Sequence, residues 1–172
     1  MARVRRCEID DAPALYALRL NALQRDPRAF LTTLEEEQTR GAAGFAERMR
    51  QSARDPACAT FGAYLDGALC GMVGTFRIDR PRVVHKAHIW GLWVAPRARR
   101  CGLARELLQA VIDELRAVEG IEQVHLTVTT GQTDAIALYR DLGFESYGLE
   151  RRSMKLGPAD YVDEELFVYR LL

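Results

Sequence analysis

The stretch VAPRARRCGLARELL, residues 94 to 108, constrains the fold of this chain more than any other segment. An apolar run stops at Pro96, a turn with the single glycine Gly102 follows, and the apolar spacing of a helix then begins. Arginines stand at positions 97, 99, 100 and 105. Because a helix N-terminus already carries partial positive charge and unpaired N–H groups, cations there cost stability unless an anion is bound. The segment therefore predicts a strand, a turn that binds an anion, and a helix; a solvated basic cap is the alternative.

The overall charge favours a small anion over a polymer. Lysines plus arginines number 24, as do aspartates plus glutamates, so the formal net charge is zero. Nucleic-acid-binding domains usually carry a basic excess, so we expect no nucleic-acid partner, although transfer RNA and the ribosome stay open as substrates. The turn contains neither GxxxxGK[ST] nor GxGxxG, which removes the P-loop and the dinucleotide-binding fingerprint.

Neither a metal nor a membrane is expected. The four cysteines, at positions 7, 58, 70 and 101, have no CxxC spacing, and the three histidines form no ligand motif with them. Reduced thiols packed as small hydrophobic side chains are the prediction. The N-terminus lacks the apolar core of a signal peptide, and no apolar run approaches the ~18 residues of a membrane span. The expected location is the cytoplasm.

The hydrophobic periods predict one α/β domain over residues 1–172, with a mixed, mostly antiparallel central sheet flanked by helices. Asp66-Gly67 splits one long β-like run into a hairpin. Residues 28–44 show no strong period and are expected to form a loop, with a turn of helix as an alternative for part of it. The remaining predicted helices are 11–26, 42–54, 103–118 and 133–142, and the predicted strands are 3–7, 58–65, 68–78, 83–95, 122–129, 144–156 and 165–171.

Two motifs resemble the GCN5-related N-acetyltransferase (GNAT) family. The segment from Arg99 to Ala104, RRCGLA, matches the signature [Q/R]-x-x-G-x-[G/A], and AIALYRDLGFESYG, residues 135 to 148, is similar to A-x-x-LY-x-x-x-GF. The resemblance implies that the loop binds the pyrophosphate of acetyl-coenzyme A. Its implied coenzyme-binding residues are Arg99, Arg100, Cys101, Gly102, Leu103, Ala104 and Arg105. Many members have asparagine where this chain has Gln132, so Gln132 is a further candidate.

The same resemblance implies roles on the strand at 83–95. The backbone of Leu92, Trp93 and Val94 would pair with the pantetheine arm and polarise the thioester oxygen. Gly91 is expected to form a bulge or a point of close approach. Trp90 is expected to pack in the core or to wall the acceptor pocket.

The chemistry of acetyl transfer suggests the remaining candidates. Tyr139 matches the tyrosine that meets the coenzyme sulfur, where its hydroxyl would stabilise the departing thiolate. His88 has a reference pKa suited to a general base, although a strand histidine is often structural. Glu35 and Glu36, in the predicted loop, are candidates to attract a cationic amine, with a solvated acidic run as the alternative.

The predicted function is transfer of an acetyl group from acetyl-coenzyme A to a primary amine by direct attack in a ternary complex. The acceptor would be a small amine, a protein N-terminus or a lysine. A non-catalytic acyl-coenzyme A sensor and a transferase for a longer acyl group are the alternatives. The resemblance also suggests a homodimer, because homodimers are common in the family.

Overall fold

The computed structural model describes residues 2–171 and contains a seven-stranded sheet in the order β1-β2-β3-β4-β5-β7-β6. Neighbouring strands are antiparallel except β4 and β5, which are parallel. This confirms the predicted mixed, mostly antiparallel α/β fold. The strands are β1 (Ala2–Arg6), β2 (Thr60–Leu65), β3 (Ala68–Arg77), β4 (Lys86–Val94), β5 (Gln123–Thr129), β6 (Glu145–Lys155) and β7 (Tyr161–Arg170).

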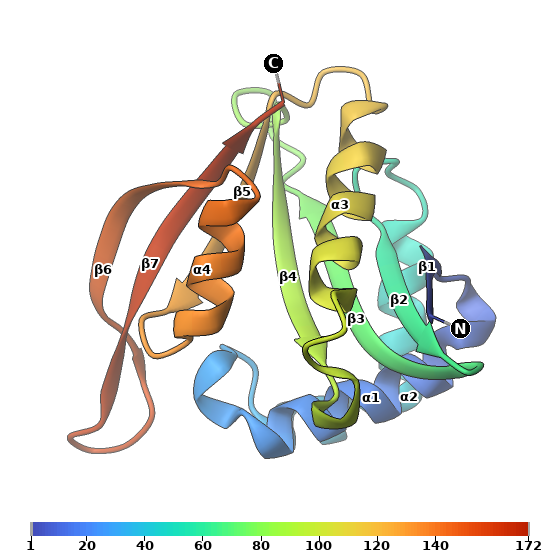
Figure 1. Cartoon of the computed structure of the whole chain (residues 1–172), viewed down its shortest axis with the longest axis horizontal. Helices are drawn as coiled ribbons and strands as arrows, with labels where there is room; N and C mark the ends of the chain where they lie inside the picture. Colours follow the sequence, from blue (N-terminus) through green and yellow to red (C-terminus); the bar gives the residue numbers. More distant parts are fainter. Residues whose placement is uncertain (1, 172) are drawn as a thin grey trace.

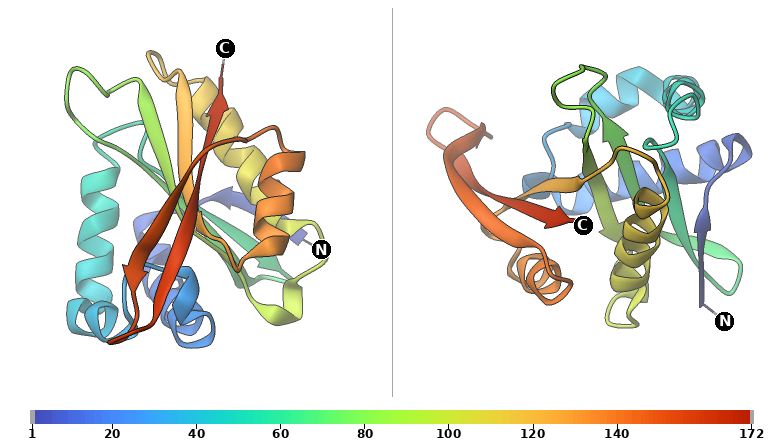
Figure 2. Two further views of the ribbon diagram at one scale, coloured as in Figure 1. Left: turned by 90° about the vertical axis from the view of Figure 1, so that its left-hand side faces the viewer. Right: turned by 90° about the horizontal axis from the view of Figure 1, so that it is seen from above.

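Four helices cover the two faces of this sheet (Figure 1). The pair α3 (Leu103–Arg116) and α4 (Thr133–Asp141) lies on one face, and the pair α1 (Ala12–Arg25) and α2 (Leu34–Ser52) lies on the other (Figure 2). Among residues 2–171, no helix is both long enough and apolar enough to cross a bilayer.

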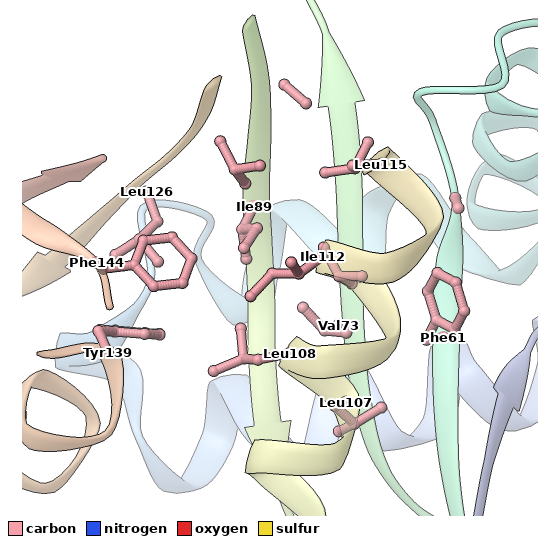
Figure 3. Close-up of a cluster of buried hydrophobic side chains, with 14 of the residues drawn as sticks. Phe61, Val73, Ile89, Leu107, Leu108, Ile112, Leu115, Leu126, Tyr139 and Phe144 are labelled. Carbon is pink, nitrogen blue, oxygen red and sulfur yellow. The ribbon is translucent and has the colours of Figure 1, made fainter. Parts of the chain in front are cut away.

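The main core lies between α3 and the sheet, as the helical period of residues 103–118 predicts. Leu107, Leu108, Val111, Ile112 and Leu115 are each at most 1% exposed. Figure 3 shows several of these side chains directed toward β3 and β4. Burying each of them contributes about 1.5–3 kcal/mol. Because α3 is fixed so firmly, its N-terminus and the turn before it hold a defined position beside the end of β4.

The prediction of a loop over residues 28–44 is wrong from residue 34 onward, where α2 begins. Thr33 accepts a hydrogen bond from the backbone N–H of Glu36, while the Glu36 carboxylate accepts one from the N–H of Thr33, so a capping box begins α2. Gly41 then interrupts the helix with φ of 69°. Before Gly41 the helix carries one apolar residue, Leu34, so the sequence shows no helical period there.

Most other element boundaries differ from the predictions by one to four residues, and two of them lie near the site or in α2. The last strand begins at Tyr161 rather than at residue 165. The second helix ends at Ser52 rather than at residue 54. The additional residues of β7 include Glu164, which lines the cavity described below.

Candidate active site

A gap opens in the sheet between β4 and β5. These parallel strands pair only over Lys86–His88 and Gln123–His125, and beyond that point they diverge (Figure 1). The part of β4 from Ile89 to Val94 therefore has no partner on its β5 side. Unpaired backbone groups of this kind can bind an extended ligand in the manner of an added strand.

Gly91 forms the bulge that the sequence predicts in β4. Trp90 is paired with Gly74 and Trp93 with Met72, so that Gly91 and Leu92 together face the single residue Val73. The φ of Gly91 is +66°, a conformation that favours glycine. The extra residue reverses the alternation of the strand.

Because of this bulge, the two tryptophans lie on the α1 side of the sheet. Trp93 is buried and donates a hydrogen bond from Nε1 to Asp26, just past the end of α1, at 2.6 Å. The indole of Trp90 lies flat over Gly74, where a Cβ atom would come within 2.1 Å of the ring. Leu92 packs against the α3 side instead.

A cavity of about 700 Å³ runs through the gap. Its wall includes the predicted residues His88, Trp90, Leu92, Gln132 and Tyr139. Tyr139 and Gln132 come from the α4 side, whereas Trp90 lies on the α1 side. A ligand on one face can therefore meet a second ligand on the other.

The arginine-rich turn has the backbone geometry of an anion site. Gly102 is the N-cap of α3 with φ of +81°, and it has no side-chain cap. Arg100 also has a positive φ, of 62°. The first N–H groups of a helix have no partner within it, so those following Gly102 remain free to donate to an anion.

The four arginines of this turn differ in their partners. Arg99 donates from Nε to the Val94 carbonyl at 2.8 Å and from Nη2 to Asp26 at 2.9 Å. Arg105 donates to Asp141. Within residues 2–171, Arg97 and Arg100 form no hydrogen bond or ion pair. The free charge of the turn therefore belongs to Arg97 and Arg100.

The bond from Arg99 also helps to orient β4. Ala95 donates its N–H to the Cys70 carbonyl of β3, and backbone groups alternate along a strand. The neighbouring groups of Val94 consequently point away from β3, which agrees with the capture of its carbonyl by Arg99. The Val94 N–H is left open toward the gap.

Tyr139 is buried against Phe144 and Phe167, and burial raises the pKa of its hydroxyl above the usual value near 10. Its ring lies beside Phe144 in Figure 3. No described residue hydrogen-bonds its hydroxyl, although Tyr139 lines the cavity. The hydroxyl thus keeps its proton and is a donor with no partner among residues 2–171.

Two histidines line the same cavity side by side. His88 of β4 pairs with His125 of β5, and their rings are 5.5 Å apart between centroids. Burial lowers the pKa of His88, and burial together with nearby positive charge lowers that of His125 to about 4. His125 contacts Gln123 at 2.9 Å and the Tyr147 hydroxyl at 3.4 Å. His88 forms no hydrogen bond to a described residue, so a ring nitrogen is available.

The acidic run at 35–37 is divided between surface and interior. Glu35 and Glu36 are exposed and do not line the cavity, and Glu36 caps α2. Glu37 is fully buried and forms ion pairs with Arg19, Arg40 and Arg48. Sequence reasoning missed Arg19 and Arg48, both of which line the cavity. The spacing of Glu37 from Arg40 and Arg48 indicates an ion-pair cluster only once all three residues are known to lie on one helix.

His125 and Glu164 were also missed, and both line the cavity. Glu164 accepts a hydrogen bond from Ser153 of β6. Within the described part of the chain, no group of three or more His, Cys, Asp or Glu residues is placed to hold a metal ion.

Comparisons with known proteins agree with this architecture. A model of the acetyltransferase (GNAT) family matches residues 13–144. The solved acetyltransferase of the GNAT family from Streptococcus pneumoniae superposes with a TM-score of 0.82 at 25% identity over 99% of both chains. The Salmonella typhimurium protein yncA, solved with its cofactor acetyl-CoA, superposes with a TM-score of 0.85 at 17% identity, over 99% of this chain and 94% of that one. The chain therefore belongs to the GNAT family.

A curated relative matches part of the chain. The N-alpha-acetyltransferase RimI of Mycobacterium tuberculosis is 37% identical over 100 residues, which is 58% of this chain. That match spans 60% of the relative's own length. The likeness is thus to a portion of that protein.

Proposed function

We propose that this protein is an acetyl-coenzyme A-dependent N-acetyltransferase that moves the acetyl group to a primary amine by direct attack while both substrates are bound. The observation that carries the proposal is the gap between β4 and β5. Open backbone groups, an anion site and the Tyr139 hydroxyl all adjoin it. Family membership, and a structural relative solved with acetyl-CoA, support the same activity.

The residues present fit the coenzyme. The free N–H groups after Gly102 would hold the pyrophosphate, with Arg100 as the adjacent unpaired charge. The open N–H of Val94 and the backbone of Leu92 would pair with the pantetheine arm. Gln132, just before α4, would contact the coenzyme from the other side of the gap. When bound, acetyl-coenzyme A supplies a thioester carbonyl, which is the electrophile of the reaction.

His88 is the proposed acceptor of the amine proton. An alkyl amine with a pKa near ~10.4 is almost wholly protonated at pH 7, so it must lose a proton before it attacks. His88 lies at the gap, and its lowered pKa keeps it neutral at pH 7. A C–N bond forms, the C–S bond breaks, and the surplus amine proton passes to His88 directly or through one water.

Tyr139 is proposed to stabilise the departing thiolate. Its raised pKa makes complete proton transfer to a thiolate unfavourable, because a thiol has a reference pKa near ~8.5. A hydrogen bond from the hydroxyl to the developing negative charge does not require that transfer.

The acceptor is proposed to be a small amine, or the N-terminus or a lysine of a protein. The N-alpha-acetyltransferase relative is named for the terminal amine. Acceptor choice is proposed to reside in the part of the cavity on the α1 and α2 side, where the wall is formed by Arg19 of α1, Arg48 of α2 and residues 29–32.

Calorimetric titration with acetyl-coenzyme A, with ATP and NAD as phosphate-bearing controls, tests the first half of the proposal. We expect selective micromolar binding of acetyl-coenzyme A. A screen of amines for release of free thiol then tests transfer. Equal binding of all three nucleotides would contradict the assigned loop, and binding without turnover of any amine would point to a sensor.

Tyr139→Phe tests the catalytic assignment. Loss of the hydroxyl should lower kcat by about 10²-fold, as when one donor is removed from a developing anion, with little change in coenzyme affinity. Tyr169→Phe is the control, because Tyr169 accepts a hydrogen bond from Arg116 away from the cavity. An unchanged kcat in Tyr139→Phe would remove Tyr139 from the chemical step.

A further inference from the structure

The guanidinium of Arg19 is buried but is not fully hydrogen-bonded by the described residues. Arg19, on α1, is 4% exposed, and neither its Nε nor its Nη1 has a hydrogen-bond partner among the described residues. Its guanidinium carbon lies 4.6 Å from the ring centroid of Phe30 and 5.9 Å from that of Trp90. Leaving buried charged donors unpaired is costly, so such groups usually have a partner in the working state of a protein.

Glu37 does not fill this need. The distance from Arg19 Nε to Glu37 Oε2 is 3.7 Å, an ion pair but too long for a hydrogen bond. The same carboxylate accepts a hydrogen bond from Arg48 at 2.9 Å and contacts Arg40 at 3.5 Å. Three guanidinium groups thus share one carboxylate, and positive charge remains in excess.

This excess charge faces the acceptor side of the cavity. Arg19 and Arg48 line it together with Trp90 and Gly91. The guanidinium carbon of Arg48 is 5.5 Å from the Trp90 ring centroid, so both arginines lie against one indole face or its edge. A Cβ atom at Gly91 would be 3.6 Å from Nη1 of Arg19. The unpaired donors consequently end beside the β4 bulge, next to the proposed point of attack.

We propose that Arg19 and Arg48 form a subsite that binds a carboxylate of the amine acceptor, and that the acceptor is a free amino acid. The inference rests on the proposed function and deepens it. A guanidinium presents forked donors that match a carboxylate. Since the donors lie so close to the bulge, only a few bonds can separate the carboxylate from the reacting amine. An α-amino acid has that spacing.

Matched acceptors test the subsite directly. Each standard L-amino acid is compared with its own amide as acceptor, with release of free thiol from acetyl-coenzyme A as the readout. The two members of a pair share a side chain and differ at the carboxyl group, and kcat/KM is expressed per neutral amine because the carboxylate raises the pKa of the neighbouring amine. We expect kcat/KM to favour the acid by about 10-fold or more for the best pair. Equal values for every acid and its amide would overturn the proposal.

Variants assign that preference to Arg19. In Arg19→Gln the ratio of kcat/KM for acid over amide should fall toward one, and Arg19→Lys should restore part of it by keeping the charge without the fork. Arg48→Gln is the second variant, because its half-buried side chain is more tolerant of change. Arg50→Gln is the control on the same helix, since Arg50 is exposed, pairs with Glu47 and does not line this cavity. A preference that survives in both Arg19→Gln and Arg48→Gln would overturn the proposal.

A peptide arm separates the two possible sources of the carboxylate. Glu-Ala-amide and Gln-Ala-amide differ only in a side-chain carboxylate. If only this pair shows an Arg19-dependent preference, the free amino acid is the wrong source and an acidic peptide N-terminus replaces it.

Binding keeps the inference separable from the proposed activity. N-acetyl-L-leucine and N-acetyl-L-leucinamide are titrated into the protein with coenzyme A present, and tryptophan fluorescence is recorded. Tighter, Arg19-dependent binding of the acid without any turnover would sustain the subsite while the proposed activity fails. Turnover that treats acids and amides alike would sustain the activity and overturn the subsite.

Discussion

Two groups of arginines lie near β4, and they differ in exposure, partners and expected role. The turn at 97–102 carries exposed arginines beside free backbone N–H groups, and Arg99 there is tied to Asp26. The cluster of Arg19, Glu37 and Arg48 is buried or half-buried between α1, α2 and the sheet. Exposed charges strengthen the binding of an extended anionic ligand, and salt screens that interaction. A buried cluster instead holds charge at one fixed position. The first is suited to the coenzyme and the second to discrimination between acceptors.

Glu37→Gln is expected to have the largest effect, because the buried cluster depends on its one carboxylate. The change leaves Arg19 and Arg48 without a compensating charge, and removal of one partner of a buried ion pair typically costs about 3–5 kcal/mol. Urea unfolding measures the loss. Glu35→Gln is the matched control on the same helical turn, where the side chain is exposed, and should unfold like the parent protein. A Glu37→Gln protein of parental stability would mean that the cluster carries no structural role.

Gly102→Asp is expected to affect coenzyme binding at the turn at 97–102 and to lower the unfolding free energy less than Glu37→Gln does. A carboxylate beside the pyrophosphate site, on a residue with φ of +81°, should weaken acetyl-coenzyme A binding by about 100-fold. Gly102→Ala separates the backbone cost, of about 1 kcal/mol, from the charge. Calorimetry provides both affinities. If the two variants lose the same affinity, charge at the turn is irrelevant to binding and the contrast between the two groups fails.

Arg100→Gln and Arg105→Gln sharpen the comparison within the exposed group. Arg100 has no partner in the described chain, whereas Arg105 pairs with Asp141. Loss of Arg100 should weaken coenzyme binding about tenfold and flatten its dependence on salt, and loss of Arg105 should do less. Affinities measured at two salt concentrations check this order. A larger loss of affinity in Arg105→Gln than in Arg100→Gln would mean that Arg105, although paired with Asp141, contributes more to coenzyme binding than Arg100 does.

The exposed group could be predicted from the sequence, and the buried one could not. The arginine turn is local, since Pro96, Gly102 and the helical period that follows stand within a few residues of one another. Tyr139 was found through the second motif, which is local as well. Arg19 and Arg48 lie far apart in the chain, and their meeting with Glu37 depends on the first part of α2, where the sequence has almost no apolar residues to reveal a helix. Glu164, which lines the cavity, likewise lies in the part of β7 that the sequence did not predict. Local patterns therefore predicted the residues proposed for the coenzyme, whereas tertiary packing brings together the residues proposed for the acceptor.

The smallest expected effect lies outside both arginine groups, in the pH dependence of stability. Arginines keep their charge over the accessible range, so histidines dominate between pH 6.5 and about 4.5. His125 has its pKa lowered to about 4, and that of His88 is also lowered, so the unfolded chain binds protons that the folded chain does not. The unfolding free energy should therefore fall as the pH drops from about 7 toward 4.5.

Carboxylates act in a separate window. The Arg5 guanidinium lowers the pKa of Asp11 to about 2, so stability from that pair is lost only below pH 3.8. Urea unfolding of His125→Gln, measured from pH 7 to pH 4.5, should show a shallower slope than the parent protein. Tyr147→Phe is the control, because it removes only the 3.4 Å contact to His125 and leaves the imidazole in place. An unchanged slope in His125→Gln would mean that His125 titrates as it does in the unfolded chain, and neither arginine group would then explain any remaining dependence on pH.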